Sequence, residues 1–171
     1  MAYIKQNPLA ILPQNIEMIF FDFDGVFTTN EVIVNENGEE SVICNRSDGL
    51  GVSMLHKLKI PMMIISTEKN PVVTHRANKM KIPVTQGAPN KESILKKIIK
   101  DKGINWENVI YVGNDVNDAA CMNLVGVSVA PGNAHPHIWD IAKIVLLHDG
   151  GKGAVRELVD YIIEVRRDTN R

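Results

Sequence analysis

The stretch Met18-Ile19-Phe20-Phe21-Asp22-Phe23-Asp24-Gly25 decides the fold. Its first four residues form a continuous apolar run, which is typical of a strand buried on both faces of a sheet. The run ends at two aspartates separated by one residue. A buried strand that ends in carboxylates predicts a sheet whose carboxyl edge carries ligand-binding groups.

The rest of the chain alternates short apolar runs with amphipathic stretches, the pattern of a parallel sheet covered by helices. The sequence therefore predicts an α/β, Rossmann-like fold in which helices flank a central parallel sheet. Further strands are expected over 62–65, 109–112, 127–129 and 144–146. Helices are expected after the N-caps Ser47, Asn70 and Asn90, ending near 58, 80 and 101, and over about 116–123 and 153–165. We expect residues 1–16 to be an irregular lead-in and 17–171 to be a single domain.

A β-hairpin is expected directly after the first strand. Val32–Val34 and Ser41–Ile43 are short runs rich in β-branched residues, and they flank the turn sequence Asn35-Glu36-Asn37-Gly38.

Composition narrows the class of ligand. Nineteen basic and twenty acidic residues give a net charge of −1, which does not favour binding to nucleic acid. No apolar run approaches the roughly 20 residues of a membrane span, and no leader pattern is present, so we expect a cytoplasmic protein with no membrane partner. The five histidines and two cysteines match no metal-binding spacing. A small-molecule substrate is the remaining expectation.

Polar residues fall repeatedly where a predicted strand gives way to a helix. Taken singly, each has an ordinary explanation: an Asp-x-Asp pair is usually a turn, and a lysine at a helix start is usually solvated. Their shared position is the stronger signal, because the carboxyl ends of parallel strands meet at one edge. The residues expected there are Asp22, Asp24, Ser66, Lys91, Asn114, Asp115 and Asp118.

This set of side chains suits phosphoryl transfer. Asp22 is the candidate nucleophile, and Asp24 is the candidate acid that protonates the leaving oxygen. Ser66 and Lys91 would contact the phosphate. Mg²⁺ is the expected cofactor because it prefers oxygen ligands, and the candidate ligands are Asp22, Asp24, Asn114, Asp115 and Asp118.

From about residue 17 to 165 the sequence resembles the haloacid dehalogenase (HAD) superfamily. Asp22–Val26 is similar to its first motif, Ser66 to its second, Lys91 to its third and Gly113–Asp118 to its fourth. The hairpin, standing where a cap domain would be inserted, resembles the capless branch that acts on 2-keto-3-deoxy sugar acid phosphates. That branch includes phosphatases for the 8-phosphate of KDO and the 9-phosphates of KDN and N-acylneuraminate. Arg46–Gly49 and Gly150–Glu157 are also similar to this branch.

The resemblance implies a small-molecule sugar acid phosphate as substrate and a homotetramer in which a hairpin flap replaces the cap. Glu68, Arg76 and Lys79 are similar to the residues that select the substrate in KDN 9-phosphate enzymes, which favours a nine-carbon substrate over KDO 8-phosphate. Because Arg76 and Lys79 are three residues apart, they share one helix face. The alternative is a solvated basic face, which is common on short helices.

Two residues depart from the family pattern. Asn114 stands where a magnesium-binding aspartate is usual, and Thr29 where the first motif often has another aspartate. Asn114 favours an alternative function, a noncatalytic oligomerising module that supports a sialate cytidylyltransferase. A receiver-like phosphoacceptor domain is a third hypothesis, and it explains Asp24-Gly25 and Lys91 less well.

Overall fold

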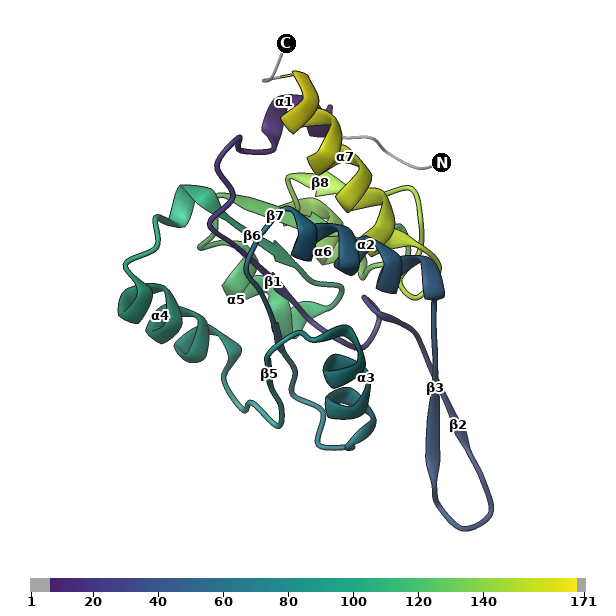
Figure 1. Cartoon of the computed structure of the whole chain (residues 1–171). Helices are drawn as coiled ribbons and strands as arrows, with labels where there is room; N and C mark the ends of the chain where they lie inside the picture. Colours follow the sequence, from purple (N-terminus) through teal and green to yellow (C-terminus); the bar gives the residue numbers. More distant parts are fainter. Residues whose placement is uncertain (1–6, 169–171) are drawn as a thin grey trace.

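The computed structural model describes residues 7–168 and contains a six-stranded parallel sheet with the order β5-β4-β1-β6-β7-β8 (Figure 1). The strands are β1 (Met18–Phe21), β4 (Met62–Ile65), β5 (Val84–Thr85), β6 (Val109–Val112), β7 (Val127–Ala130) and β8 (Ile144–Val145). After β1 the chain adds β4 and β5 on one side, then crosses to add β6, β7 and β8 on the other. The strand order therefore reverses next to β1, and ligands of parallel sheets bind at such a point.

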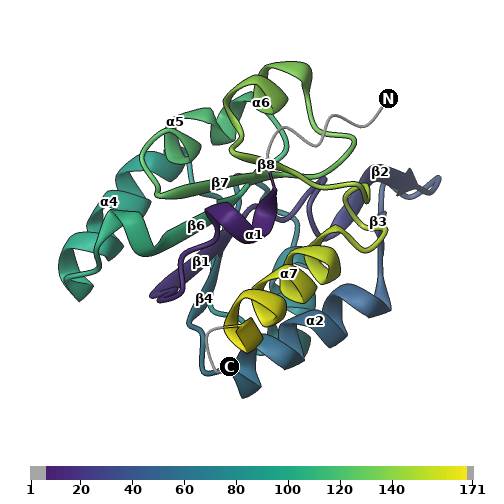
Figure 2. The ribbon, with the colours of Figure 1, turned by 90° about the horizontal axis from the view of Figure 1, so that it is seen from above.

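Helices cover both faces of the sheet (Figure 2). One apolar core joins the sheet to α2 (Arg46–Lys57), α3 (Val72–Met80) and α7 (Ala154–Asp168). A second core lies on the opposite face, under α4 (Lys91–Lys102), α5 (Ala119–Met122) and α6 (Pro136–Ile141). All four residues of β1 and of β6 are buried, which explains their unbroken apolar sequences.

The predicted α/β fold and its central strands are confirmed, with differences at the edges. β5 and α6 were missed, because two residues give too short a pattern and α6 is a helix of only six residues. The expected helix over 116–123 begins as a 3-10 turn, Val116–Asp118, before α5. Another short 3-10 turn, Trp106–Asn108, precedes β6.

The expected caps are partly corrected. Asn90 caps α4 as predicted. The N-cap of α3 is Pro71 rather than Asn70, although Asn70 Oδ1 accepts a hydrogen bond from the Val72 N–H at the first residue of the helix. The N-cap of α2 is Asn45 rather than Ser47, because the Asn45 side chain accepts from the Ser47 N–H.

The expected irregular lead-in is also corrected in part. Residues 8–11 form a one-turn helix, α1 (Pro8–Ile11), capped by Asn7, and it packs beside α7. Residues 1–6 of that expectation lie outside the described part of the chain. Among the helices of residues 7–168, none is long and apolar enough to cross a membrane.

The hairpin of β2 (Thr28–Val34) and β3 (Glu40–Cys44) projects from the body of the domain (Figure 1). Val32, Ile33 and Val34 are 53%, 56% and 59% exposed, although β-branched side chains of this kind are usually covered. The hairpin tip carries the exposed acidic side chains Glu36 and Glu39. Within one chain, therefore, the hairpin is a two-stranded ribbon with uncovered apolar side chains.

Candidate active site

A cavity of about 290 Å³ lies at the carboxyl ends of β1 and β6. Four of the predicted site residues line it: Asp22, Asp24, Asn114 and Asp115. Its other lining residues are Asn30, Thr67, Val116 and Asn117. The position matches the point where the strand order reverses, so the topology brings together residues that are distant in sequence.

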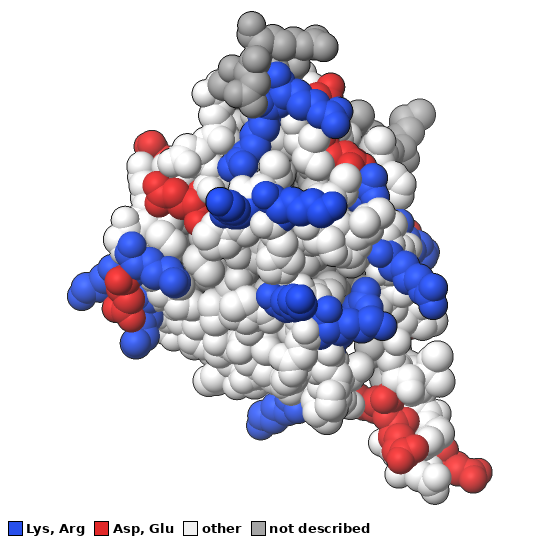
Figure 3. Space-filling model, in the orientation of Figure 1, with Lys and Arg blue, Asp and Glu red and all other residues white. Residues whose placement is uncertain are grey.

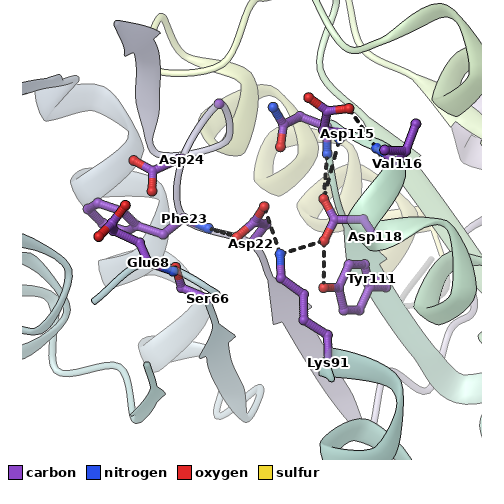
Figure 4. A network of polar contacts seen from close by, with 12 residues as sticks. Asp22, Phe23, Asp24, Ser66, Glu68, Lys91, Tyr111, Asp115, Val116 and Asp118 are labelled. Carbon is purple, nitrogen blue, oxygen red and sulfur yellow. Dashed lines mark hydrogen bonds and ion pairs between the residues drawn. The ribbon is translucent and has the colours of Figure 1, made fainter. Parts of the chain in front are cut away.

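A buried charged network forms the floor of the site (Figure 4). Lys91 Nζ lies 2.8 Å from Asp22 Oδ2 and 2.8 Å from Asp118 Oδ1. Burial lowers the pKa of Lys91, but the two carboxylates outweigh it and raise the pKa above its ordinary value. Lys91 is therefore held as a cation between two carboxyl groups, at the first residue of α4.

Asp118 anchors this network instead of facing the cavity. Its Oδ1 also accepts from the Tyr111 hydroxyl at 2.9 Å, and its Oδ2 accepts from the backbone N–H groups of Asn114 at 3.0 Å and Asp115 at 3.4 Å. Both carboxylate oxygens are thus occupied, and the side chain is fully buried. This geometry separates Asp118 from the other expected magnesium ligands and favours a positioning role for it.

The surroundings of Asp22 strongly shift its pKa. Burial, followed by the negative charge of Asp118, raises the pKa of Asp22 to about 8, although Lys91 and the Phe23 N–H act in the opposite direction. The Phe23 N–H donates to Asp22 Oδ1 at 2.7 Å and fixes the orientation of the carboxylate. Perturbed carboxyls of this kind are typical of active sites.

Asp24 lies beside Asp22 but in a different environment. Burial, followed by the negative charge of Glu68, raises its pKa. The Thr28 hydroxyl lies 3.4 Å from Asp24 Oδ1 and lowers the pKa in part. A carboxyl whose pKa is raised keeps its proton at higher pH, which suits a general acid.

The donor set of the cavity fits a hard divalent cation. Carboxylate oxygens of Asp22 and Asp115, the amide oxygen of Asn114 and the backbone carbonyl oxygen of Asp24 are the ligand types that Mg²⁺ prefers, and ligation through its backbone leaves the Asp24 carboxyl able to act as the acid. In residues 7–168 no group of three or more Asp, Glu, His or Cys side chains is arranged to hold a metal ion. The amide oxygen of Asn114 is therefore an important further ligand for a metal ion in this cavity, although an aspartate at this position would also add negative charge.

Asn114 is held tightly by its surroundings. A Cβ added to Gly25, whose φ is +71°, would overlap the Asn114 amide, so the two residues pack face to face. The Asn114 N–H donates to Asp118, and its carbonyl accepts from the His135 N–H at 2.8 Å. Asp115 Oδ1 is in contact with the Val116 N–H at 2.7 Å.

Ser66 and Glu68 follow β4 at the edge of the site (Figure 4). Ser66 is buried, and its Oγ accepts from the Glu68 N–H at 3.1 Å, which leaves the hydroxyl proton able to donate. The Glu68 carboxylate accepts from the N–H groups of Lys69 and Asn70, and its charge acts on Asp24.

Arg76 and Lys79 lie apart from this cavity. They share one face of α3, as predicted, but that face borders a groove between α2 and α3. Arg46, His56 and Lys81 also line the groove, and no acidic residue does. Lys and Arg side chains spread over this side of the molecule in Figure 3. The structure therefore places Glu68 at the edge of the site, close enough to act on Asp24, and leaves Arg76 and Lys79 in a separate groove.

Two polar residues that support the site were missed in the sequence. Tyr111 interrupts an aliphatic strand, and a buried tyrosine hydroxyl normally has a partner, which here is Asp118. Thr28 Oγ1 accepts from the N–H groups of Gly25 and Asn30, which shapes the loop after Asp24. In the sequence, Tyr111 is recognisable as a polar residue within a strand that is predicted to be buried. Nothing in the sequence pattern distinguishes Thr28.

Comparison with known proteins places this site in a family. Residues 55–158 match the model of the haloacid dehalogenase-like hydrolases, and the chain belongs to that family. Within it, the chain is a phosphatase similar to the 3-deoxy-D-manno-octulosonate (KDO) 8-phosphate phosphatase of Escherichia coli K12. The two are 35% identical over 151 residues, 88% of this chain and 80% of that protein. The N-acylneuraminate cytidylyltransferase of Oncorhynchus mykiss is 27% identical over 91% of this chain, which corresponds to 37% of that longer protein.

Solved structures agree with this placement. A HAD family hydrolase from Streptomyces avermitilis has 44% identity and a TM-score of 0.86, with 89% of this chain and 88% of that chain covered. The KDO 8-phosphate phosphatase of Moraxella catarrhalis, solved with magnesium, phosphate and KDO, has 26% identity and a TM-score of 0.86, with 92% and 91% covered. These structures share the fold, and the second holds the metal for which the donor set here is suited.

Proposed function

We propose that this protein is a Mg²⁺-dependent phosphatase that hydrolyses a 2-keto-3-deoxy sugar acid phosphate through an aspartyl-phosphate at Asp22. The observation that carries the proposal is the pairing of Asp22 and Asp24 in one cavity, with Lys91 fixed against Asp22 at 2.8 Å. The similarity to KDO 8-phosphate phosphatases supports the same class of substrate.

The two aspartates divide the reaction between them. An Asp22 oxygen bonds to phosphorus while the bond from phosphorus to the sugar oxygen breaks, and Asp24 gives its proton to that oxygen. A water oxygen then bonds to phosphorus and loses a proton to Asp24, while the bond from phosphorus to the Asp22 oxygen breaks, which releases inorganic phosphate and restores the Asp22 carboxylate. The Ser66 hydroxyl and Lys91 hold phosphate oxygens. Asp22, Asp24, Asn114 and Asp115 would hold magnesium, which would supply positive charge against the phosphate oxygens.

We also propose a preference for a nine-carbon sugar acid, through Glu68, Arg76 and Lys79. Glu68 lies close enough to Asp24 to raise its pKa, so a substrate whose leaving oxygen lies at Asp24 is also close to Glu68. Beyond it, Arg76 and Lys79 offer positive charge on α3 to the sugar acid carboxylate. Similarity to an N-acylneuraminate cytidylyltransferase supports a nine-carbon substrate.

We further propose a homotetramer. Within residues 7–168 no cap domain covers the catalytic cavity, and the neighbouring hairpin exposes Val32, Ile33 and Val34. A two-stranded ribbon is marginally stable alone and gains stability when its apolar side chains pack on another subunit.

The decisive experiment is a phosphate-release screen with magnesium over KDO 8-phosphate, KDN 9-phosphate and N-acylneuraminate 9-phosphate. The highest kcat/KM is expected for a nine-carbon substrate. Arg76→Ala should remove most of that preference, because a lost charged contact costs about 1.5–3 kcal/mol, which corresponds to roughly a 10- to 100-fold change in kcat/KM. Lys81→Ala, in the same groove, is the control. A parent enzyme that prefers KDO 8-phosphate would overturn the preference without affecting the proposed chemistry.

A second candidate function is a noncatalytic module that supports a sialate cytidylyltransferase. Asn114 favours it, because an amide adds no charge to a metal site, and so does the match to part of such an enzyme. The absence of phosphate release from all three substrates at saturating magnesium would make this candidate the better one.

A further inference from the structure

We infer that the turn Gly150–Gly151 is a positioning element for Asp24, acting through backbone contact with the loop that carries it. The inference rests on the proposed function, because it assigns a role in the same reaction. The turn lies between β8 and α7, far in sequence from Asp24, and neither glycine lines the catalytic cavity.

The contact between the turn and the loop has no room for side chains. The Gly151 N–H donates to the Val26 carbonyl at 3.0 Å. A Cβ on Gly150 would overlap the Gly25 carbonyl, and one on Gly151 would overlap the backbone of Thr28 and Thr29. The two backbones therefore lie directly against each other.

The loop on the other side of this contact sets the position of Asp24. Thr28 Oγ1 accepts from the Gly25 N–H at 3.1 Å and the Asn30 N–H at 3.2 Å, and the same hydroxyl lies 3.4 Å from Asp24 Oδ1. A shift of Gly25 or Thr28 would carry Asp24 with it. Small displacements of a catalytic acid strongly lower the reaction rate, because proton transfer requires hydrogen-bond distance between donor and acceptor.

Side chains of α7 and α2 hold the segments on either side of the turn in place. Glu157 of α7 accepts from the N–H groups of Leu147 and His148, from His148 Nδ1 and from the Tyr161 hydroxyl. The buried Asp48 of α2 accepts from the Arg156 N–H at 2.9 Å and so fixes the start of α7.

A third anchor holds the turn directly. Asn133 Oδ1 accepts from the Gly150 N–H at 2.9 Å. The turn is thus fixed to helices on one side and presses on the Asp24 loop on the other, which makes it a rigid support rather than a flexible linker.

The test compares substrates that do and do not need an acid. The sugar alkoxide of KDO 8-phosphate must be protonated as it leaves, whereas p-nitrophenolate leaves without a proton. Misplacing Asp24 should therefore reduce turnover of the sugar phosphate far more than turnover of p-nitrophenyl phosphate. Asp24→Asn serves as the reference for this pattern.

Gly150→Ala is expected to reproduce that pattern. Its kcat on KDO 8-phosphate should fall by roughly tenfold more than its kcat on p-nitrophenyl phosphate, or by a larger factor, because general acid catalysis accelerates a reaction by about 10²–10⁴-fold. Gly103→Ala is the control, because its Cβ would meet nothing within 4 Å although its φ is +64°. Equal losses on both substrates for Gly150→Ala, where Asp24→Asn shows unequal losses, would overturn the inference, because Asp24 also serves as the base in the hydrolysis of the aspartyl-phosphate that both substrates share.

Amide hydrogen exchange tests the contact without any turnover. Gly150→Ala should speed exchange in peptides covering residues 22–30, and Gly103→Ala should not. Asn133→Ala, at an exposed side chain, is a milder variant that should show the same change if Gly150→Ala fails to fold. Unchanged exchange in a folded variant would overturn the inference, whereas an inactive parent would count only against the proposed function.

Discussion

Lys91 Nζ lies 2.8 Å from Asp22 Oδ2 in a site where both side chains are almost fully buried. The same ammonium group contacts Asp118 at 2.8 Å, so a single cation balances two carboxyl groups. A buried charge that loses its partner is costly, whereas an exposed pair contributes little. The network is therefore both a catalytic arrangement and a source of stability that depends on one lysine.

Lys91→Ala should abolish phosphate release and lower the free energy of unfolding by about 3–5 kcal/mol, the usual cost of breaking a buried ion pair. Urea unfolding of parent and variant measures the difference. Lys96→Ala removes an exposed lysine from the same helix, where it pairs with Glu92, and should change stability by less than about 1 kcal/mol. Similar losses for the two variants would show that burial of Lys91 does not matter.

Asp22→Asn should abolish turnover with the fold intact, because an amide cannot accept the phosphoryl group. Normal circular dichroism with no phosphate release is the expected result. Turnover retained by this variant would remove Asp22 from the mechanism.

The same variant should alter the dependence of stability on pH. The pKa of Asp22 is raised from 3.8 to about 8 in the folded protein. Between these values the unfolded chain releases the proton and the folded chain keeps it, so this group's contribution to stability is lost as pH rises toward 8. In metal-free buffer, the free energy of unfolding of Asp22→Asn should therefore rise relative to that of the parent by at least about 1 kcal/mol between pH 5 and pH 8. A difference that is constant with pH would contradict the raised pKa.

Asn114→Asp should lower the magnesium concentration that gives half-maximal phosphate release, because it adds a carboxylate to the cavity. Asn117→Asp is a matched control in the same cavity wall, since Asn117 is not a proposed ligand. An equal shift in both variants would indicate a general effect of negative charge rather than ligation by residue 114.

Ile33→Glu should reduce the molar mass measured by light scattering from that of a tetramer to that of a smaller species. It places a charge where the hairpin exposes an apolar side chain, which is 56% accessible in one chain. Asn37→Glu adds the same charge at the hairpin turn without removing apolar surface, and it should leave the mass unchanged. A monomeric parent at micromolar concentration would contradict the proposed assembly.

The sequence by itself determined the α/β class, the central strands and the residues at the strand-to-helix junctions. These features are local: β1 and β6 are unbroken apolar runs, and Asn90 caps its own helix. Once the sheet is parallel, its carboxyl edge collects Asp22, Asp24 and Asn114 without further information.

Only the tertiary structure decided what each polar side chain contacts. Asp118 was expected to bind metal with the other carboxylates, but Tyr111, Lys91 and two backbone N–H groups occupy its oxygens. Arg76 shares a helix face with Lys79 as predicted, yet the packing of α3 against α2 turns that face to a separate groove. The contact of Gly150 with Gly25 joins two loops distant in sequence, and no periodicity encodes it. Spacing along the chain sets which face or edge a residue occupies, whereas its partners depend on how the elements pack in three dimensions.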